Sequence, residues 1–424
     1  MELETLELPK TIIPLLEKTH AASAEVRRLN DTQKKGILNR LALVLVENTA
    51  QIISENQKDL SRMDISDPKY DRLKLTEARI EDLAESMREI ANLTDPSGKI
   101  FMESELANGL KIKKISVPMG VIGVIYEARP NVTVDVTALC LRSGNAVVLR
   151  GGSDAFDTNS FLVALIHDVL REFGVDTNCI TLLPPDRELV KELLTATRYV
   201  DLIIPRGSES LIQFVRKHSL VPTIETGAGV CHTYVEATAD LQKAADIVVN
   251  AKVSRPSVCN SLDTVIVDEV IAETFLPMLK ADFLKWNVEI FADEISHKIL
   301  SNIEYPYLQK ATQDDFGREF LAYKCSIKVV SGINEALEHI SKYSSRHSEA
   351  ILSNNQEYCD QFIQEVDAAA VYTNASTRFT DGGQFGLGAE IGISTQKLHA
   401  RGPFALEKLV TEKWIVTGDG QVRW

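Results

Sequence analysis

The chain has 424 residues, a hydrophobic fraction of 44%, a charged fraction of 25% and a formal net charge of −14. This length accommodates two or three domains with their own cores, and the composition is typical of a globular protein. This net negative charge gives no basic surface for binding nucleic acid or an anionic membrane, so these partners are not expected. It leaves open a local basic pocket for a phosphorylated substrate.

Targeting signals and metal motifs are absent from the sequence pattern. The apolar runs are far shorter than the roughly 20 residues of a membrane span, and Met1–Lys10 lacks the basic-then-apolar order of a signal peptide. The cysteines at positions 140, 179, 231, 259, 325 and 359 form no CxxC pair and no metal-ligand spacing. We therefore expect a cytoplasmic protein with reduced thiols and no metal.

The first hundred residues predict helices. Asp31 is the expected cap of an amphipathic helix running through Ile37 and Leu45, and Glu77–Ala91 is expected to form another helix. Between Leu110 and Val117, apolar residues alternate with lysines, which is typical of an exposed strand.

Short apolar strands then alternate with helices. The expected strands are Val121–Tyr126, Ala146–Arg150, Ile180–Leu183 and Leu202–Pro205, and the expected helices are Val134–Leu141, Asn159–Phe173, Arg187–Thr195 and Glu209–His218. This repeat predicts a mostly parallel sheet that is covered on both faces. A second alternating series runs from Ala239 to Val371, with helices over Ile271–Leu284 and Ile333–Tyr343, and Trp414–Arg423 predicts strand, turn and strand.

Cys259 is the candidate nucleophile. It lies between an expected helix, Leu241–Lys252, and an expected strand, Asp263–Val267, and an Arg-Pro pair just before it disfavours helical geometry. Loops held between rigid elements carry catalytic groups, and the nearby cations Lys252 and Arg255 favour a thiolate. An inert buried cysteine is the alternative interpretation.

Two glycine-containing turns, Arg142-Ser143-Gly144-Asn145 and Arg150-Gly151-Gly152-Ser153, flank one of the expected strands. Glycines there let backbone N–H groups approach a phosphate, which Arg150 can neutralise, although tight connection geometry is the alternative. No complete GxGxxG lies between a strand and a helix, so any nucleotide must be bound in another way.

Several motifs together resemble the aldehyde dehydrogenase superfamily. They are Glu127–Asn131, Gly144–Arg150, Gly229–His232, Asn250–Lys252 followed by Cys259-Asn260, Arg378–Gly383 and the C-terminal block Phe385–Pro403. The C-terminal block narrows the resemblance to the branch that reduces an acyl phosphate of glutamate. The resemblance covers nearly the whole chain and is weakest over residues 1–100 and 285–315.

The resemblance implies an α/β fold with two parallel-sheet domains and a small β oligomerisation arm. The cofactor-binding domain would use residues 1–104, 119–228 and 376–400, the catalytic domain residues 229–375, and the arm residues 105–118 and 401–424. An isolated two-stranded ribbon is marginal unless something covers it, so the arm is expected to pair with another subunit of a homo-oligomer, a dimer or a tetramer.

The resemblance also implies roles for single residues. Cys259 matches the nucleophile that forms a thioester, and Asn131 matches the asparagine that holds the oxyanion together with the backbone N–H of the nucleophile. Arg150 stands where a lysine usually contacts the adenosine ribose, and Ser153 stands where members that prefer NAD often carry a glutamate. The expected cofactor is therefore NADPH.

Further positions match the nucleotide site of the superfamily. Gly207 and Ser208 are expected at the pyrophosphate, with an ordinary helix cap as the alternative for Ser208. Glu319 and Phe320 match the pair that fixes the nicotinamide ribose, although a glutamate in such a position is more often simply solvated.

The expected reaction is the NADPH-dependent reduction of L-glutamyl 5-phosphate to L-glutamate 5-semialdehyde and phosphate through a thioester, in proline biosynthesis. The glutamate kinase that supplies this labile substrate is a further expected partner. The anionic substrate requires cations, and the candidates are Arg255, Arg378, His399 and Arg401. For each of them a structural ion pair is the alternative.

Glu225 leaves other functions open. It lies 34 residues before Cys259, the spacing of the general base in oxidising aldehyde dehydrogenases, so an oxidising NAD(P)-dependent enzyme is the alternative. Thr226 and Ala228 depart from the oxidising pattern, which favours a structural or binding role for Glu225. A non-enzymatic scaffold is a third hypothesis, and the presence of Cys259 with Asn131 argues against it.

Overall fold

The computed structural model describes residues 11–67 and 69–423, and the chain divides into two compact units. The first unit comprises Met1–Thr226, Gly386–Gly392 and Phe404–Trp424, and the second comprises Gly227–Phe385 and Ile393–Pro403. The predicted assignment of residues 376–400 to the cofactor domain therefore differs from the observed division. Asn260 in the second unit holds the backbone carbonyls of Arg378 and Thr380, which keeps that segment with the catalytic loop.

The first unit contains a parallel four-stranded sheet in the order β5-β4-β3-β6. Its strands are β3 (Val121–Tyr126), β4 (Ala146–Arg150), β5 (Ile180–Leu182) and β6 (Leu202–Arg206). The sequence prediction of these strands is confirmed to within one residue at each end. They are apolar along almost their whole length because helices cover both faces of the sheet.

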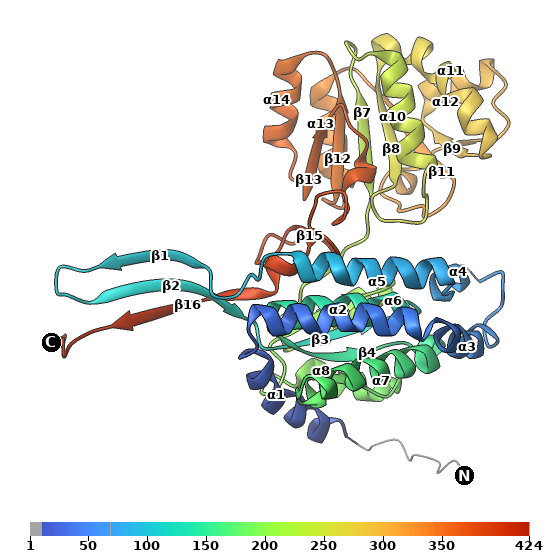
Figure 1. Ribbon diagram of the computed structural model, residues 1–424. Coiled ribbons are helices and arrows are strands. Elements are labelled where there is room, and N and C mark those ends of the chain that lie inside the picture. Colours follow the sequence, from blue (N-terminus) through green and yellow to red (C-terminus); the bar gives the residue numbers. More distant parts are fainter. Residues whose placement is uncertain (1–10, 68, 424) are drawn as a thin grey trace. The chain divides into compact units, whose positions relative to one another are not determined.

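Nine α-helices belong to the described part of the first unit. They are α1 (Ile13–Val26), α2 (Asp31–Glu47), α3 (Thr49–Leu60), α4 (Tyr70–Leu73), α5 (Glu77–Asn92), α6 (Pro130–Ser143), α7 (Phe156–Glu172), α8 (Arg187–Thr195) and α9 (Glu209–His218). Helices α6 and α7 pack together beside the sheet, and α2 and α5 lie side by side against α6 (Figure 1). The helix α6 begins four residues before the predicted start, because Pro130 at its first position suits a helix N-terminus.

Asn30 caps α2, so the prediction of Asp31 as the cap is wrong by one residue. The Asn30 side chain accepts from the Gln33 N–H, and the Gln33 side chain accepts from the Asn30 N–H, which forms a capping box. Asn and Asp are equally good caps, so the residue preference alone does not separate the two positions. Asp31 instead lies in the first turn, 2.6 Å from the buried Arg142 guanidinium.

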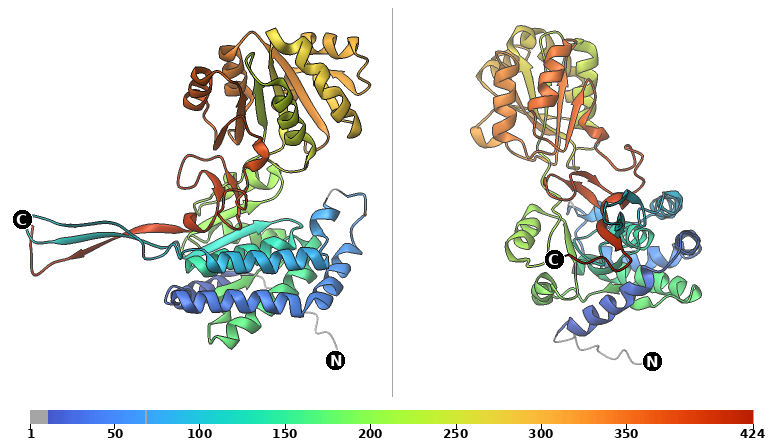
Figure 2. Two further views of the ribbon diagram at one scale, coloured as in Figure 1. Left: turned by 45° about the horizontal axis from the view of Figure 1, so that its top comes forward. Right: turned by 90° about the vertical axis from the view of Figure 1, so that its left-hand side faces the viewer.

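A three-stranded antiparallel ribbon, the arm, extends from the body of the first unit (Figure 2). It consists of β1 (Ile100–Glu105), β2 (Lys111–Pro118) and β16 (Val410–Thr417), with β2 in the middle. The predicted strand at 110–117 is confirmed. Of the strand–turn–strand prediction for 414–423, the first strand is confirmed as the end of β16, and the second strand is wrong, because residues 418–423 form no strand. Beyond Thr417 the Gln421 side chain bonds to Asp419 N and Asn108 O, so this segment folds against the β1–β2 turn.

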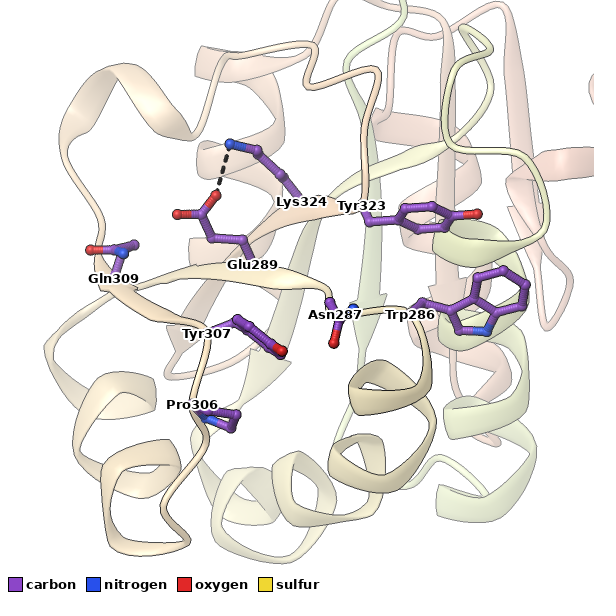
Figure 3. A pocket seen from close by; sticks show the side chains of 8 residues that line it. All are labelled: Trp286, Asn287, Glu289, Pro306, Tyr307, Gln309, Tyr323 and Lys324. Atoms are coloured by element: carbon purple, nitrogen blue, oxygen red, sulfur yellow. Dashed lines mark ion pairs between the residues drawn. The ribbon is translucent and has the colours of Figure 1, made fainter. Parts of the chain in front are cut away.

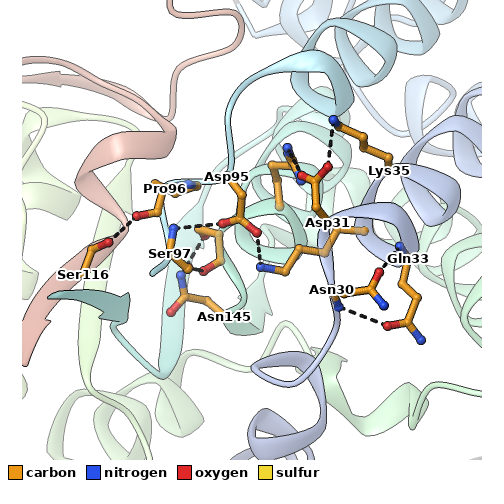
Figure 4. A network of polar contacts seen from close by, with 12 residues as sticks. Asn30, Asp31, Gln33, Lys35, Asp95, Pro96, Ser97, Ser116 and Asn145 are labelled. Atoms are coloured by element: carbon orange, nitrogen blue, oxygen red, sulfur yellow. Dashed lines mark hydrogen bonds and ion pairs between the residues drawn. The ribbon is translucent and has the colours of Figure 1, made fainter. Parts of the chain in front are cut away.

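A polar network joins the base of the arm to the sheet (Figure 4). The buried Asn145 accepts from the Gly120 N–H and donates to the Leu409 carbonyl and the Ser143 hydroxyl, each at 2.8 Å. Beside it the buried Lys34 ammonium lies 2.7 Å from the Asp95 carboxylate. Asn145 thus connects the starts of β3 and β4 to the segment that leads into β16.

The second unit contains a parallel seven-stranded sheet in the order β10-β9-β11-β8-β7-β12-β13. Its strands are β7 (Cys231–Val235), β8 (Leu262–Asp268), β9 (Glu289–Ala292), β10 (Leu308–Lys310), β11 (Lys324–Val330), β12 (Ser348–Leu352) and β13 (Ala370–Thr373). Helices α10 (Leu241–Val253), α11 (Glu269–Lys285) and α12 (Glu294–Asn302) form one apolar core with the sheet, and α13 (Ile333–Tyr343) and α14 (Gln356–Glu365) form another.

The predicted fold class, two parallel-sheet α/β domains with a small β arm, is confirmed. A short two-stranded sheet, β14 (Gly392–Ser394) with β15 (Gly402–Phe404), completes the strands. None of the helices within residues 11–67 and 69–423 has the length and apolar character to cross a membrane.

Asn145→Ala is expected to destabilise the first unit by about 2–4 kcal/mol, because it leaves a buried N–H and a buried carbonyl without their partner. The urea unfolding midpoint measures this change. Asn178→Ala is the matched control, since the exposed Asn178 contacts only its own turn around Asp176. Equal midpoints for the two variants would contradict the assignment.

Candidate functional site

Cys259 lies in the loop between α10 and β8, at the amino end of the second unit's sheet. Its side chain is partly exposed, whereas the other five cysteines are buried. Burial raises the pKa of the Cys140 and Cys231 thiols well above the usual range, so both stay protonated at neutral pH. Cys259 is therefore the cysteine that solvent and a substrate can reach.

The backbone of Cys259 is held by close contact with the chain that enters β7. A Cβ atom built on Gly229 would lie 1.6 Å from the Cys259 carbonyl oxygen, so only glycine fits there. The same carbonyl accepts from the buried Cys231 thiol at 3.3 Å. These contacts fix the main chain of Cys259, the predicted nucleophile, while its side chain stays accessible.

Asn260 anchors the other side of this loop. Its buried amide donates to the Thr380 carbonyl at 2.9 Å and to the Arg378 carbonyl at 3.3 Å. Its carbonyl oxygen accepts from the Arg378 guanidinium, and its backbone oxygen accepts from Thr377 at 2.8 Å. Arg378 also reaches the Ser254 hydroxyl at 3.1 Å, so it spans the loop that carries Cys259.

Two cations are therefore associated with the Cys259 loop: Arg255, which lies in it, and Arg378, which bonds to it from the turn Thr377–Phe379. Burial and then the charge of Arg255 lower the pKa of Arg378, which indicates two like charges close together. Lys252, the other cation expected to favour the thiolate, is buried with its ammonium 3.7 Å from Asp263. Its charge is compensated inside the core, so Arg255, which is exposed, is the nearer electrostatic influence on a substrate.

Glu319 and Phe320 lie on the segment between β10 and β11. The Glu319 carboxylate accepts from the Gly229 N–H at 2.8 Å, beside the backbone that contacts Cys259. Phe320 stacks on Phe291 with ring centroids 5.3 Å apart, and its N–H donates to Asp263. The structure thus places the predicted Glu-Phe pair next to Gly229, the residue that contacts the main chain of Cys259.

In the first unit, Arg150 is the last residue of β4, and Ser153 follows at the carboxyl end of that strand. Parallel sheets bind ligands at this edge, at the point where the strand order reverses, here between β3 and β6. The Arg150 guanidinium donates to the Pro185 carbonyl at 2.8 Å, and burial together with the charge of Arg187 lowers its pKa. Arg187, which sequence reasoning missed, therefore adds a second cation at this edge, and Ser153 is exposed nearby.

Gly207 and Ser208 lead from β6 into α9, at the same edge of the sheet. The Glu127 carboxylate accepts from the Ser208 hydroxyl at 2.8 Å and from its N–H at 3.1 Å. A Cβ atom on Gly207 would lie 2.8 Å from that carboxyl group. The donors at the start of α9 are thus bonded to a carboxylate of the chain itself, Glu127.

Asn131 lies in the first turn of α6, one turn before Asp135. Its amide nitrogen is 3.3 Å from an Asp135 carboxylate oxygen, and the Ser86 hydroxyl lies 3.5 Å from the other oxygen. Burial raises the pKa of Asp135 to about 6, against the opposing influence of these hydrogen bonds and of the Arg206 charge. The i, i+4 spacing of Asn131 and Asp135 was the available sequence signal for this pair.

The remaining predicted residues lie in other surroundings. Glu225 is 3.7 Å from the Arg216 guanidinium. Arg401 is 2.7 Å from Asp367, just before β13, and His399 has a positive φ of 62° on the same segment. Cys259 precedes β8, and the strands β7 and β12 lie between β8 and β13 in the sheet order, so the structure does not bring Arg401 into the Arg255–Arg378 pair.

A separate pocket of about 590 Å³ lies at the outer part of the second unit's sheet (Figure 3). Trp286 stacks on Tyr323 at its rim with ring centroids 5.4 Å apart, and Lys324 pairs with Glu289 at 2.7 Å. None of the predicted site residues lines this pocket. Among the described residues, no cluster of three or more His, Cys, Asp or Glu side chains could hold a metal ion.

The two parallel-sheet units and the β arm agree with the comparisons, which place the chain among oxidoreductases of the aldehyde dehydrogenase family. Residues 15–296 match the aldehyde dehydrogenase family, and the chain belongs to that family. An acetylating aldehyde dehydrogenase from Geobacillus thermoglucosidasius, 15% identical with a TM-score of 0.72 over 97% of each chain, shares the fold.

Closer relatives narrow the class. The γ-glutamyl phosphate reductase of Bacteroides thetaiotaomicron is 53% identical over 95% of this chain and 97% of its own. That of Chlorobaculum parvum is 52% identical over 98% and 99%. The crystal structure of γ-glutamyl phosphate reductase from Thermotoga maritima has 41% identity and a TM-score of 0.92 over 98% and 100%. Within its family the chain therefore groups with the γ-glutamyl phosphate reductases.

Asp135→Asn is expected to stabilise the protein at pH 8 and to have almost no effect at pH 4. An acid with a raised pKa binds its proton more tightly in the folded state, so stability is lost as the pH rises from about 4 to 6 and stays lost above it. Removing the charge at pH 8 should increase the free energy of unfolding by at most about 3 kcal/mol. Urea midpoints of variant and wild type between pH 4 and 8 measure this; a difference that does not change with pH would contradict it.

Proposed function

We propose that this chain catalyses the reduction of L-glutamyl 5-phosphate to L-glutamate 5-semialdehyde and phosphate with NADPH, a step of proline biosynthesis. The observation that carries the proposal is the single accessible cysteine, Cys259, on a loop pinned at both sides. The relatives that match almost the whole chain bear the name of this activity.

Members of the aldehyde dehydrogenase family use a nicotinamide cofactor, and the edge of the first unit's sheet suits one. Arg150 and Ser153 would hold the adenosine ribose, Gly207 and Ser208 the pyrophosphate, and Glu319 with Phe320 the nicotinamide ribose. When bound, the cofactor supplies the hydride that the acyl carbon receives. Ser153 stands where a carboxylate would accept a 2′-hydroxyl, and the Arg150–Arg187 pair favours the 2′-phosphate of NADPH.

Cys259 supplies the nucleophile. Its thiolate attacks the acyl carbon, and the negative charge that develops on the acyl oxygen is held by the Asn131 amide and the Cys259 N–H. The carbon–oxygen bond to phosphate then breaks, and phosphate leaves with the bonding electron pair without needing a strong acid. Once the thioester carbon has received a hydride, which the bound nicotinamide cofactor would supply, the C–S bond would break and the electron pair would stay on sulfur. This would release the aldehyde and regenerate the Cys259 thiolate.

Arg255 and Arg378 form the proposed receptor for the acyl phosphate. Arg255 lies in the loop that carries Cys259, and Arg378 bonds to that loop from the turn after β13. Their mutual repulsion would be relieved by an anion between them. His399 and Arg401 remain secondary candidates for the other charged groups of the substrate. The Arg401–Asp367 ion pair favours a structural role for Arg401.

The arm is proposed to bind another subunit of a homo-oligomer. It exposes a row of large apolar side chains, of which Phe101, Trp414 and Val416 are each about half exposed or more. Such side chains on a thin ribbon are expected at an interface.

We propose a cytoplasmic enzyme, with glutamate kinase as the source of its labile substrate.

The oxidising alternative requires Glu225 as a general base that activates water. Glu225 instead lies 3.7 Å from the Arg216 guanidinium, and this ion pair favours the structural or binding role over that of a general base. A scaffold without chemistry would have no need for an accessible thiol on a fixed loop.

A direct test measures NADP reduction with glutamate 5-semialdehyde in the presence and absence of inorganic phosphate. Oxidation that is independent of phosphate would favour the alternative and sink the proposal.

Cys259→Ser is expected to abolish turnover, because a hydroxyl of much higher pKa cannot replace the thiolate without a dedicated base. The phosphate-dependent assay measures it, and Cys359→Ala on α14 is the control. Native iodoacetamide labelling should modify Cys259 first, and activity should disappear in step with that labelling. An active Cys259→Ser enzyme would refute the assignment of the nucleophile.

Ser153→Glu is expected to shift the preference from NADPH towards NADH. The new carboxylate would repel a 2′-phosphate and accept from a 2′-hydroxyl, and each tenfold change in the ratio of kcat/KM values corresponds to about 1.4 kcal/mol. Ser301→Glu, on an exposed position of α12, adds the same charge elsewhere and is the control. A cofactor ratio that moves equally in both variants would place Ser153 away from the ribose.

Arg255→Ala is expected to raise the KM for phosphate in the semialdehyde-oxidising direction by about tenfold or more, because a charge-assisted contact is lost. The KM for NADP should change far less. Arg171→Ala, which removes an exposed cation on α7, controls for net charge. If both KM values rose together, or only the melting temperature fell, Arg255 would be structural.

A further inference from the structure

The carboxylate of Asp135 is in direct contact with the side chain that the proposed mechanism assigns to the oxyanion. Asn131 and Asp135 stand one turn apart on α6, and the Asn131 amide nitrogen lies 3.3 Å from an Asp135 oxygen. The Ser86 hydroxyl of α5 approaches the other oxygen at 3.5 Å. Asp135 thus lies between the first turn of α6 and the neighbouring helix.

A carboxamide presents different chemistry at its two ends. Its nitrogen carries two N–H donors, and its oxygen only accepts, so rotation by half a turn exchanges a donor for an acceptor. An ionised carboxylate accepts only, and it therefore selects the orientation in which the nitrogen faces it. One N–H of Asn131 then bonds to Asp135, and the second N–H stays available on the same nitrogen.

The energetics indicate that Asp135 is not kept for stability. A side-chain pair at this spacing contributes only about 0.2–0.5 kcal/mol to a helix. Burial, meanwhile, disfavours the ionised form of Asp135 and raises its pKa to about 6. The nearby Arg206 guanidinium, whose Nε is buried without a hydrogen-bond partner among the described residues, offsets part of that cost. Groups held in costly ionised states concentrate at functional sites.

We propose that Asp135 is a positioning residue, which fixes the Asn131 carboxamide so that its nitrogen, and not its oxygen, is presented to the acyl oxygen of the substrate. This inference rests on the oxyanion role of Asn131 in the proposed function. Without Asp135, the carboxamide rotates and its oxygen repels the developing negative charge in a fraction of the molecules. Asp135 itself contacts neither substrate nor cofactor.

A double-mutant cycle on the full-length enzyme tests this inference. Asn131→Ala should lower kcat by about 10²–10³-fold, the usual effect of removing an oxyanion donor. Asp135→Asn should lower kcat by about ten- to a hundredfold with KM for NADPH within twofold, because an uncharged amide no longer selects one orientation. Asp135→Ala, which leaves no acceptor, should lower kcat at least as much. In the Asn131→Ala background, either Asp135 substitution should have no further effect.

Asp360→Asn is the matched control. Gln356 donates to Asp360 at 2.7 Å with the same i, i+4 spacing on the exposed face of α14, so this variant removes an equivalent pair away from the site. Its kcat should equal that of the wild type. The rate of Cys259 alkylation by iodoacetamide should be unchanged in all Asp135 variants, which shows that the nucleophile loop is intact.

The outcomes separate the inference from the proposed function. A normal kcat in both Asp135 variants, with a low kcat in Asn131→Ala, overturns the positioning role and leaves the mechanism standing. A normal kcat in Asn131→Ala overturns the oxyanion assignment, and the positioning role with it. If the Asp135 and Asn131 effects multiply in the double variant, Asp135 acts by another route and the inference is wrong.

Discussion

The contact between Gly229 and the Cys259 carbonyl is the constraint on which the catalytic unit depends. A side chain at position 229 would overlap that oxygen, so β7 and the nucleophile loop approach as closely as two backbones can. Two hydrogen bonds complete the anchoring of this loop: the Cys231 thiol donates to the Cys259 carbonyl, and the Asn260 amide donates to the Thr380 carbonyl. A fixed main chain matters because the backbone N–H of the nucleophile is itself a proposed oxyanion donor, and a shift of a few tenths of an ångström would misplace it.

Most of the fold was predictable because the local signals agree with one another. Parallel strands buried on both faces are continuous apolar runs, so Val121–Tyr126 and Ala146–Arg150 were located to the residue. The prediction was wrong where two neighbouring residues have nearly equal preferences for the same position, or where a contact with a residue far away in the sequence determines the local structure. Asn30 and Asp31 are both good caps, and only the Gln33 side chain decides between them. The last strand ends at Thr417 because Gln421 bonds to Asn108, more than three hundred residues away in sequence.

The site was predictable in its chemistry but not in its supporting contacts. Cys259 and Asn131 were recognised from motifs, and the accessible thiol agrees with that expectation. Lys252 was expected to act on the thiolate, yet its ammonium is buried against Asp263, a partner on the following strand. Arg187 and Asp135 gave no strong signal, because a single charged residue on a helix is usually solvated. Their importance follows only from which charges lie next to them in the folded chain.

The acidic chain faces the problem of binding two anionic ligands, and its cations are arranged in pairs that suit this task. Burial and the Arg187 charge lower the pKa of Arg150, and burial and the Arg255 charge lower the pKa of Arg378. Two like charges placed close together destabilise the folded state, and an anion that binds between them removes this repulsion. One pair lies at the edge of the first unit's sheet and the other on the Cys259 loop, and we propose that they receive the cofactor phosphate and the acyl phosphate respectively. With a net charge of −14, the chain as a whole repels anions, so such local pairs of cations are what an anionic ligand requires for binding.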